Sequence, residues 1–189
     1  MKKHTPNKSR GFTLVELLTV VAIIGILAGI LIPVVGGAKK NALKAKTKAQ
    51  FSGWATALEA YKNEYGHYPK IGSLATEGEL VLDGGSKSQD FMKALSGRDP
   101  STGERDTSEN RKAIGFYSFG DSELQEGTDY VLVDAFGNPN IHIKVDANGD
   151  GIVDISNAPD DVDGDDLKTR VAIWVDEADG EDYETVTNW

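Results

Sequence analysis

The chain has 189 residues, of which 30 are acidic and 20 basic, a formal net charge of −10 and no cysteine. Residues 1–50 hold nine basic residues and one acid, so residues 51–189 carry a net charge of −18. So acidic a region argues against nucleic acid as a partner, because phosphate binding needs a basic surface. The lack of cysteine excludes a disulfide framework.

A long apolar run begins close to the N-terminus. Residues 12–35 contain a single ionisable side chain, that of Glu16. At a rise of about 1.5 Å per residue, this run would form a helix roughly 36 Å long, enough to cross the hydrocarbon core of a bilayer. A carboxylate costs about 2.5–3.5 kcal/mol near the bilayer centre and normally marks a partner or a function. The nearest cation, Arg10, is six residues away, so we expect a partner outside the chain or a newly made terminal amine.

Three interpretations of this N-terminus compete. A secretory signal explains the basic residues before the run, but its apolar segment is usually about 7–15 residues, and residues 17–35 are already longer. A plain membrane anchor is the second interpretation, with Glu16 reaching the interface. In the third, the chain is cut between Gly11 and Phe12, ahead of the apolar run.

The helix is expected to continue past Pro33, with a bend there. Beyond Gly36 and Gly37 the sequence is rich in Ala and Lys, which favour helix. An apolar stripe then follows at spacings of three and four, formed by Phe51, Trp54, Leu58, Tyr61 and Tyr65. The stripe predicts packing against the head domain, and Gly66 predicts the end of the helix.

The remaining sequence predicts short elements. Residues 88–95 read as a helix capped by Ser88, and residues 97–110 read as a polar loop. Alternation predicts strands at 114–119, 130–134, 140–145 and 171–175, with a turn at 134–139. We therefore expect an α+β fold in which a small antiparallel sheet packs on the long helix.

An Asp-rich loop follows the third predicted strand. Oxygen-bearing side chains alternate at Asp146, Asn148 and Asp150, and Gly151 permits a sharp turn. This spacing is typical of a calcium loop, whose predicted ligands are Asp146, Asn148, Asp150, the carbonyl of Ile152, and Asp154. An acidic hairpin turn is the alternative. The twelfth position is Asn157 rather than Glu, and flanking strands argue against a true EF-hand.

The N-terminus resembles the class III signal of type IV pilins and type II secretion pseudopilins. The shared features are a short basic leader ending in Gly11, then Phe12, Thr13, Leu14, Val15 and Glu16, and then a long apolar helix carrying Pro33. The resemblance implies cleavage after Gly11 by a prepilin peptidase and N-methylation of Phe12. It also implies that Glu16 pairs with the terminal amine of a neighbouring subunit.

Parts of the head extend this resemblance. Residues 57–69, the segment DAFGNPNIHI at 134–143 and the C-terminal Asn-Trp are similar to segments of major pseudopilins. The resemblance fails over about residues 71–111, and Ala135 and Phe136 replace the usual Pro and Trp. Major pseudopilins carry a calcium site in their C-terminal loop, for which Asp179 and Asp182 are the matching candidates.

These observations predict a pilin-like α+β protein with a leader (1–11), a transmembrane and polymerisation helix (12–35), an amphipathic helix (36–66) and a globular head (67–189). The resemblance implies a structural subunit of a type II secretion pseudopilus, anchored in the bacterial inner membrane with its head in the periplasm. Implied partners are prepilin peptidase, further copies, other pseudopilins or pilins, and an inner-membrane assembly platform. Calcium is the predicted cofactor.

Two other functions remain open. One is a type IV pilus subunit, major or minor, for adhesion, motility or DNA uptake. The other is a membrane-anchored calcium-dependent binding module that does not polymerise. An enzyme is poorly supported, because the three histidines are scattered and the chain has no cysteine nucleophile or phosphate-binding glycine motif.

Overall fold

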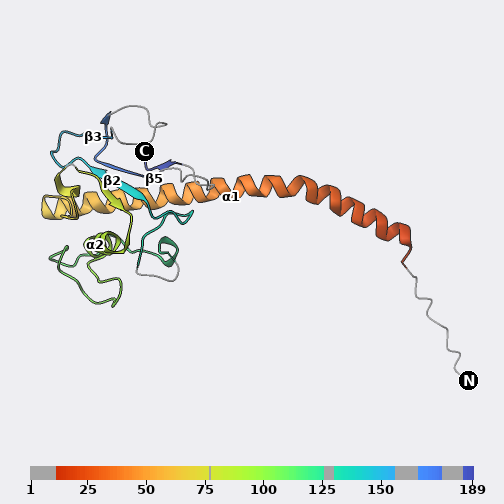
Figure 1. The fold of residues 1–189 in the computed structure, drawn as a ribbon, viewed down its shortest axis with the longest axis horizontal. Coiled ribbons are helices and arrows are strands. Elements are labelled where there is room, and N and C mark those ends of the chain that lie inside the picture. The colour runs from red at the N-terminus through yellow and green to blue at the C-terminus, as the bar shows by residue number, and fades with distance from the viewer. Residues whose placement is uncertain (1–11, 77, 126–129, 156–165, 176–184) are drawn as a thin grey trace, which may run out of the picture. The chain divides into compact units, whose positions relative to one another are not determined.

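The computed structural model describes residues 12–76, 78–125, 130–155, 166–175 and 185–189. Its dominant element is a single α-helix of 52 residues, α1 (Leu14–Tyr65), which runs through Pro33 without a break and ends before Gly66 (Figure 1). The chain divides into two compact units, Met1–Ala42 and Leu43–Trp189. The long helix and its end at Gly66 confirm the expectation from sequence.

A four-stranded antiparallel sheet forms the centre of the second unit. Its order is β1-β2-β5-β6, in which β1 is Leu80–Leu82, β2 is Ile141–Val145, β5 is Val171–Val175 and β6 is Val186–Thr187. A separate ribbon pairs β3 (Val153–Asp154) with β4 (Asp166–Leu167). The structure is therefore α+β with an antiparallel sheet, as predicted.

The main core lies between the second half of α1, the sheet and a second helix, α2 (Gly85–Ser96). The predicted stripe supplies Phe51, Trp54, Leu58 and Tyr61, all buried. Because side chains alternate across a strand, Ile141, Ile143 and Val145 of β2 also enter this core. On β5, Trp174 joins a second, smaller cluster with Val153 and Ile155 instead.

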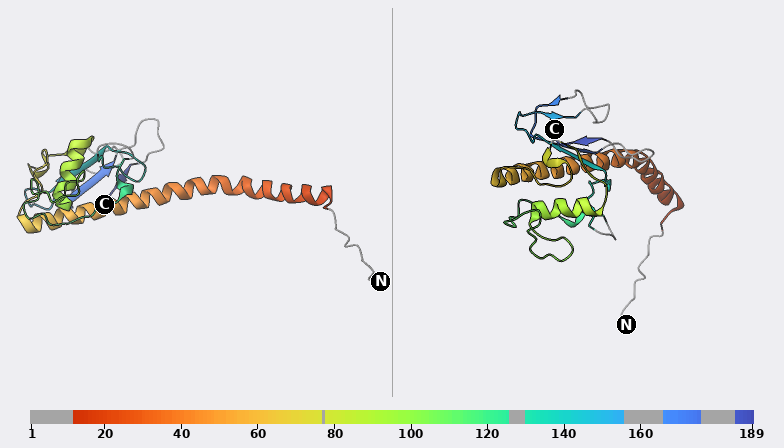
Figure 2. Two further views of the ribbon diagram at one scale, coloured as in Figure 1. Left: turned by 90° about the horizontal axis from the view of Figure 1, so that it is seen from below. Right: turned by 60° about the vertical axis from the view of Figure 1, so that its left-hand side comes forward.

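Short elements connect these parts. Two 3-10 turns, η1 (Leu74–Thr76) and η2 (Asp121–Glu123), flank the segment that contains β1 and α2. In Figure 1 and in the right-hand view of Figure 2, α2 and the loops that follow it lie on one side of the C-terminal half of α1, whereas β3 lies on the other. In the left-hand view of Figure 2, the sheet and α2 lie together on one side of α1.

Two predicted strands are wrong. Residues 114–119 form no strand, because the backbone N–H groups of Phe116 and Tyr117 both donate to the carbonyl of Leu95 at the end of α2, at 2.7 and 3.0 Å. Residues 130–134 form only an isolated bridge, between Leu132 and Leu124. Tyr130 has a φ of 52°, outside the extended region that a strand requires.

The predicted helix at 88–95 exists but starts earlier. Its N-cap is Gly84, and Ser88 is a buried residue inside α2 rather than its cap. The sequence pattern predicts no strand at β1. This strand is three residues long, and its pairing with Ile143 and Ile141 of β2 cannot be read from its own sequence.

Candidate functional site

The first turn of α1 holds the carboxylate of Glu16 in a reciprocal pair of hydrogen bonds with Thr13. The backbone N–H and the hydroxyl of Thr13 donate to Glu16 Oε2 at 2.8 and 2.7 Å, and the backbone N–H of Glu16 donates to Thr13 Oγ1 at 3.2 Å. This arrangement is a capping box, which satisfies N–H groups that have no partner within the helix.

The capping box gives Glu16 a hydrogen-bonding partner but no neutralising charge. Both groups that donate to it within the described residues belong to Thr13 and reach Oε2. The positive end of the helix dipole favours a carboxylate at this position. Sequence reasoning missed this role of Thr13, although a Thr three residues before a Glu at the start of an apolar run is a recognised pattern for a helix-capping box.

The helix surface beyond Glu16 is apolar and exposed. Phe12 is 78% exposed, and large apolar side chains remain exposed along the helix, at Leu14, Val15, Leu17, Leu18, Val20, Val21, Ile23, Ile24, Ile26, Leu27, Ile30, Leu31 and Val35. Within the described residues, α1 is the one helix long and apolar enough to cross a membrane, by length and composition. Gly11, the predicted cleavage residue, lies outside the described residues.

The Asp-rich loop is built around the buried carboxylate of Asp146. Asp146 Oδ1 accepts the N–H of Gly149 at 2.6 Å, and Oδ2 accepts that of Gly151 at 3.0 Å. The loop connects β2 to β3, so it is flanked by strands as expected. These bonds hold the loop in a tight turn around one carboxylate.

The other predicted ligands follow in sequence. Asn148 Oδ1 accepts the N–H of Asp150 at 2.8 Å, and Asp150 Oδ1 accepts the N–H of Ile152, also at 2.8 Å. Asp154 lies in β3 with an exposed side chain. In the part of the chain that the structure describes, no group of three or more His, Cys, Asp or Glu side chains is placed to hold a metal ion. Calcium at this loop stays a prediction.

A lysine of α1 connects the helix to this loop. Lys62 Nζ donates to the backbone carbonyl of Asp146 at 2.7 Å and lies 4.6 Å from the ring centroid of Tyr68. Burial raises the pKa of Tyr68 to about 12. Lys62 is 84 residues from Asp146, so no local sequence pattern indicates this contact. The second pair of predicted calcium ligands, Asp179 and Asp182, lies outside the described residues.

Comparison with known proteins connects the N-terminal geometry to a family. The family model described as prokaryotic N-terminal methylation motif matches residues 6–32. Type II secretion system core protein G of Escherichia coli (strain K12) is 41% identical over 63 residues, which are 33% of this chain and 43% of that protein. The N-terminal segment of the chain is type IV pilin-like.

Two further relatives are a secretion-system core protein G and a fimbrial protein. The core protein G of Vibrio cholerae serotype O1 is 39% identical over 69 residues, 36% of this chain and 46% of that protein. Fimbrial protein Q of Moraxella bovis is 33% identical over 93 residues, 47% of this chain and 59% of that protein. The chain thus spans about half the length of these relatives. No solved structure matches it significantly.

Proposed function

We propose that this pilin-like chain is a structural subunit of a type II secretion pseudopilus, which polymerises through residues 12–35. The observation that carries the proposal is the exposed apolar surface of α1, with one carboxylate in its first turn. Such a surface is stable in lipid before assembly and against other apolar helices after it. A carboxylate there is best stabilised by a cation, which the amine of a neighbouring subunit would supply.

The proposal includes processing and location. Prepilin peptidase would cut after Gly11, and Phe12 would become the methylated N-terminus. The match to the methylation motif, which spans both residues, supports this step. The chain would be anchored once in the bacterial inner membrane, with its head in the periplasm, and would assemble on an inner-membrane platform with further copies and other pseudopilins. Its role would be structural rather than catalytic.

A type IV pilus subunit is the second candidate. The similarity to fimbrial protein Q covers 93 residues, a longer stretch than the 63 residues shared with the Escherichia coli secretion protein. Deletion of the gene separates the two functions. Accumulation of secreted proteins in the periplasm supports the pseudopilus, whereas normal secretion with loss of surface fibres supports the pilus.

We also propose that the Asp-rich loop binds calcium. Asp146, Asn148, Asp150, the Ile152 carbonyl and Asp154 would supply oxygen ligands, the type that calcium prefers. Asp146 and Asp150 already present carboxylates in a tight turn, and the exposed Asp150 is open to solvent. A second site at Asp179 and Asp182 is proposed from the resemblance alone. Bound calcium would stabilise loops in a head that has no disulfide.

Substitutions at the first turn of α1 test the polymerisation role. Glu16→Gln keeps an acceptor for Thr13 but removes the charge. We expect the chain to remain in the membrane fraction while sheared, pelletable polymer falls by more than about tenfold, because loss of one partner from a buried ion pair is costly. Glu16→Ala should behave in the same way.

Mass spectrometry of the wild-type chain should show a methylated Phe12 at the N-terminus.

Thr13→Val is the matched control, because it removes the capping hydroxyl and leaves the charge in place. We expect it to retain most of the polymer. If Glu16→Gln polymerised normally and Thr13→Val did not, Glu16 would serve only to start the helix. An intact leader, or a cut close to Ala38, would contradict the pilin-like processing.

A further inference from the structure

A pocket of about 470 Å³ opens on the head between α2, the loop that follows it and residues 115–124. Its apolar lining comes from Met92, Pro100, Tyr117, Phe119, Leu124 and Tyr130. Pockets of this size, lined by aromatic and apolar side chains with a few polar groups, are typical ligand sites. The pocket shares no residue with the capping box, the apolar run or the Asp-rich loop, so it is separate from the sites described above.

The aromatic walls of the pocket are held by the main core. The Phe119 ring lies 6.0 Å from that of Trp54 and 6.2 Å from that of Phe91, centroid to centroid. Tyr117 packs edge-on against Phe119, with 4.9 Å between the centroids, and its hydroxyl donates to the buried carboxylate of Glu123 at 2.8 Å. Both rings are half-buried and line the pocket. Because these walls are fixed in the free protein, binding costs little ordering.

Arg98 brings a positive charge to the pocket. Its side chain is exposed and belongs to the lining, and its Nη1 donates to the carbonyl of Gly103 at 2.9 Å. A guanidinium has five N–H groups, and Arg98 forms no ion pair with the residues that the structure describes. Arg105 faces it in an antiparallel bridge, and like charges directly opposite each other are destabilising. An anion bound at Arg98 would offset this repulsion.

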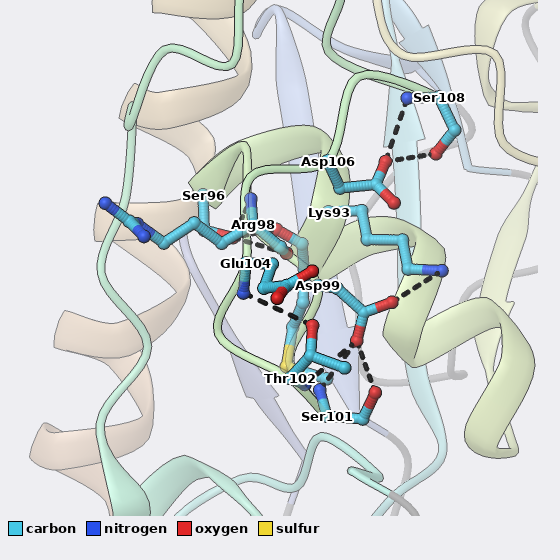
Figure 3. Close-up of polar contacts among 10 residues, drawn as sticks. Lys93, Ser96, Arg98, Asp99, Ser101, Thr102, Glu104, Asp106 and Ser108 are labelled. Carbon is cyan, nitrogen blue, oxygen red and sulfur yellow. Dashed lines mark hydrogen bonds and ion pairs between the residues drawn. The ribbon is translucent and has the colours of Figure 1, made fainter.

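Two acidic residues also line the pocket, Asp99 and Asp121. The Asp99 carboxylate is held on its own turn, where Oδ1 accepts the N–H of Ser101 at 2.8 Å and Oδ2 lies 3.5 Å from Lys93 Nζ. Hydrogen bonds from Ser101 keep the pKa of Asp99 below its usual range. Figure 3 shows Arg98 extending away from this carboxylate. Asp99 therefore does not neutralise Arg98, whereas the exposed Asp121 offers an acceptor to a ligand.

These groups together fit a ligand that carries an aromatic ring next to a carboxylate. Aromatic side chains favour edge-to-face or offset contacts with another ring. A guanidinium binds a carboxylate through paired, charge-assisted hydrogen bonds. Asp121 accepts an N–H, which a free aromatic acid lacks but the last residue of a polypeptide has in its amide. The lining therefore favours a polypeptide C-terminus over a small aromatic acid.

We propose that this pocket binds the C-terminal aromatic residue of a partner polypeptide. The ring of that residue packs against Tyr117 and Phe119. Its carboxylate pairs with Arg98, and its amide N–H donates to Asp121. α2 and the loop after it lie within residues 71–111, over which the resemblance to major pseudopilins fails, so the resemblance does not imply such a pocket. Binding here does not require polymerisation.

Methionine methyl signals measure this binding directly. The chain has two methionines, Met1 in the predicted leader and Met92 in the pocket lining. The full-length chain in detergent, with isotope-labelled methionine methyl groups, is titrated with N-acetylalanyl-phenylalanine and followed by NMR. The Met92 signal should shift saturably and the Met1 signal should not. The C-terminal amide of the same dipeptide should bind at least about tenfold more weakly, because it cannot form a charged pair with Arg98.

Substitution of Arg98 tests the ion pair. Arg98→Gln should weaken binding of the dipeptide by at least about tenfold and leave binding of its amide unchanged. A misfolded pocket would lose both ligands, so the amide separates a lost charge from a lost structure. Arg111→Gln is the matched control, because Arg111 is exposed and lies outside the lining. It should bind the dipeptide as wild type does.

Asp121→Ala tests whether the ligand is a polypeptide. It should weaken binding of the dipeptide and leave binding of phenylpropionate, which has a ring and a carboxylate but no amide, unchanged. Equal affinity of wild type for these two probes would point to a free aromatic acid and overturn the proposal. The absence of a Met92 shift with the dipeptide, or equal affinity of wild type and Arg98→Gln for it, would also overturn it.

Discussion

The carboxyl of Asp134, in the head, has a pKa on which burial and hydrogen bonding act in opposite directions. Its Oδ1 accepts the backbone N–H groups of Phe136 and Asn138, at 2.9 and 2.8 Å, and thereby holds the turn at 134–139. The side chain is buried, and Oδ2 has no hydrogen-bond partner among the residues that the structure describes. Burial raises the pKa of this carboxyl above its usual range, against the lowering effect of the backbone N–H groups. The proton is therefore bound more tightly in the folded state than in the unfolded chain.

This difference predicts a pH dependence of stability. Because the pKa is raised on folding, the contribution of Asp134 is most favourable below the ordinary aspartate pKa and is lost as pH rises through the raised value. Asp134→Asn retains an acceptor oxygen but does not titrate. In thermal unfolding of the detergent-solubilised chain, wild type should lose stability relative to Asp134→Asn as the pH rises above the ordinary aspartate pKa of about 3.9. A constant difference between the two proteins would contradict the assignment.

At the scale of elements, the end of α2 depends on a close approach between two backbone segments, at Gly97 and Ala113. Gly97 has a φ of 66° and caps the helix, and its N–H donates to the carbonyl of Lys93 at 2.9 Å. A Cβ at this position would lie 2.6 Å from the carbonyl carbon of Ala113. Nearby, buried Asn110 donates to the carbonyls of Ala94 and Ile114. The loop after α2 is thus fixed by backbone proximity and one amide.

The close approach predicts different costs for two glycine substitutions. Gly103 also has a positive φ, 71°, but a Cβ at this position would have no neighbouring atom within 4 Å. Gly103→Ala should therefore lower the free energy of unfolding only by the cost of placing Ala in the left-handed conformation, about 1–2 kcal/mol. Gly97→Ala should lower the free energy of unfolding by about 1–3 kcal/mol more, because the backbone at Ala113 must shift to admit the new Cβ. Denaturant unfolding of both variants measures the difference, and equal costs would show that the approach to Ala113 is unimportant.

At the scale of the whole molecule, charge is the main constraint on the head. Residues 51–189 carry 29 acids and 11 basic residues. Five of these eleven basic residues lie in the segment from Lys93 to Lys112, at the end of α2 and in the loop after it. Repulsion among so many carboxylates disfavours a compact state. Bound cations are a simple means of offsetting this repulsion.

The calcium proposal makes a prediction at this scale. Chelation should lower the melting temperature of the full-length chain in detergent, because an ion at about 100 times its dissociation constant stabilises by about 2.7 kcal/mol. Asp150→Ala should greatly reduce this response. Glu104→Ala, which removes an exposed acid elsewhere, is the control and should retain it. An unchanged melting temperature after chelation of the wild-type chain would exclude a stabilising site.

The sequence by itself determined the parts of this protein that depend on local pattern. The apolar run with Glu16, the stripe from Phe51 to Tyr65, and the two central strands follow from composition and periodicity. The capping box of Thr13 and Glu16 is equally local, since its two residues are three positions apart. In each case the interacting groups are neighbours along the chain.

Only the tertiary structure decided the features that join distant segments. β1 exists because β2 pairs with it, and residues 114–119 are not a strand because α2 binds their backbone. The contact of Lys62 with the Asp146 carbonyl spans 84 residues. The facing charges of Arg98 with Arg105 and of Asp154 with Asp166 depend on the register of antiparallel pairs. Register depends on which face of each of the two paired segments is buried and on the turns that join them, so it cannot be read from one segment alone.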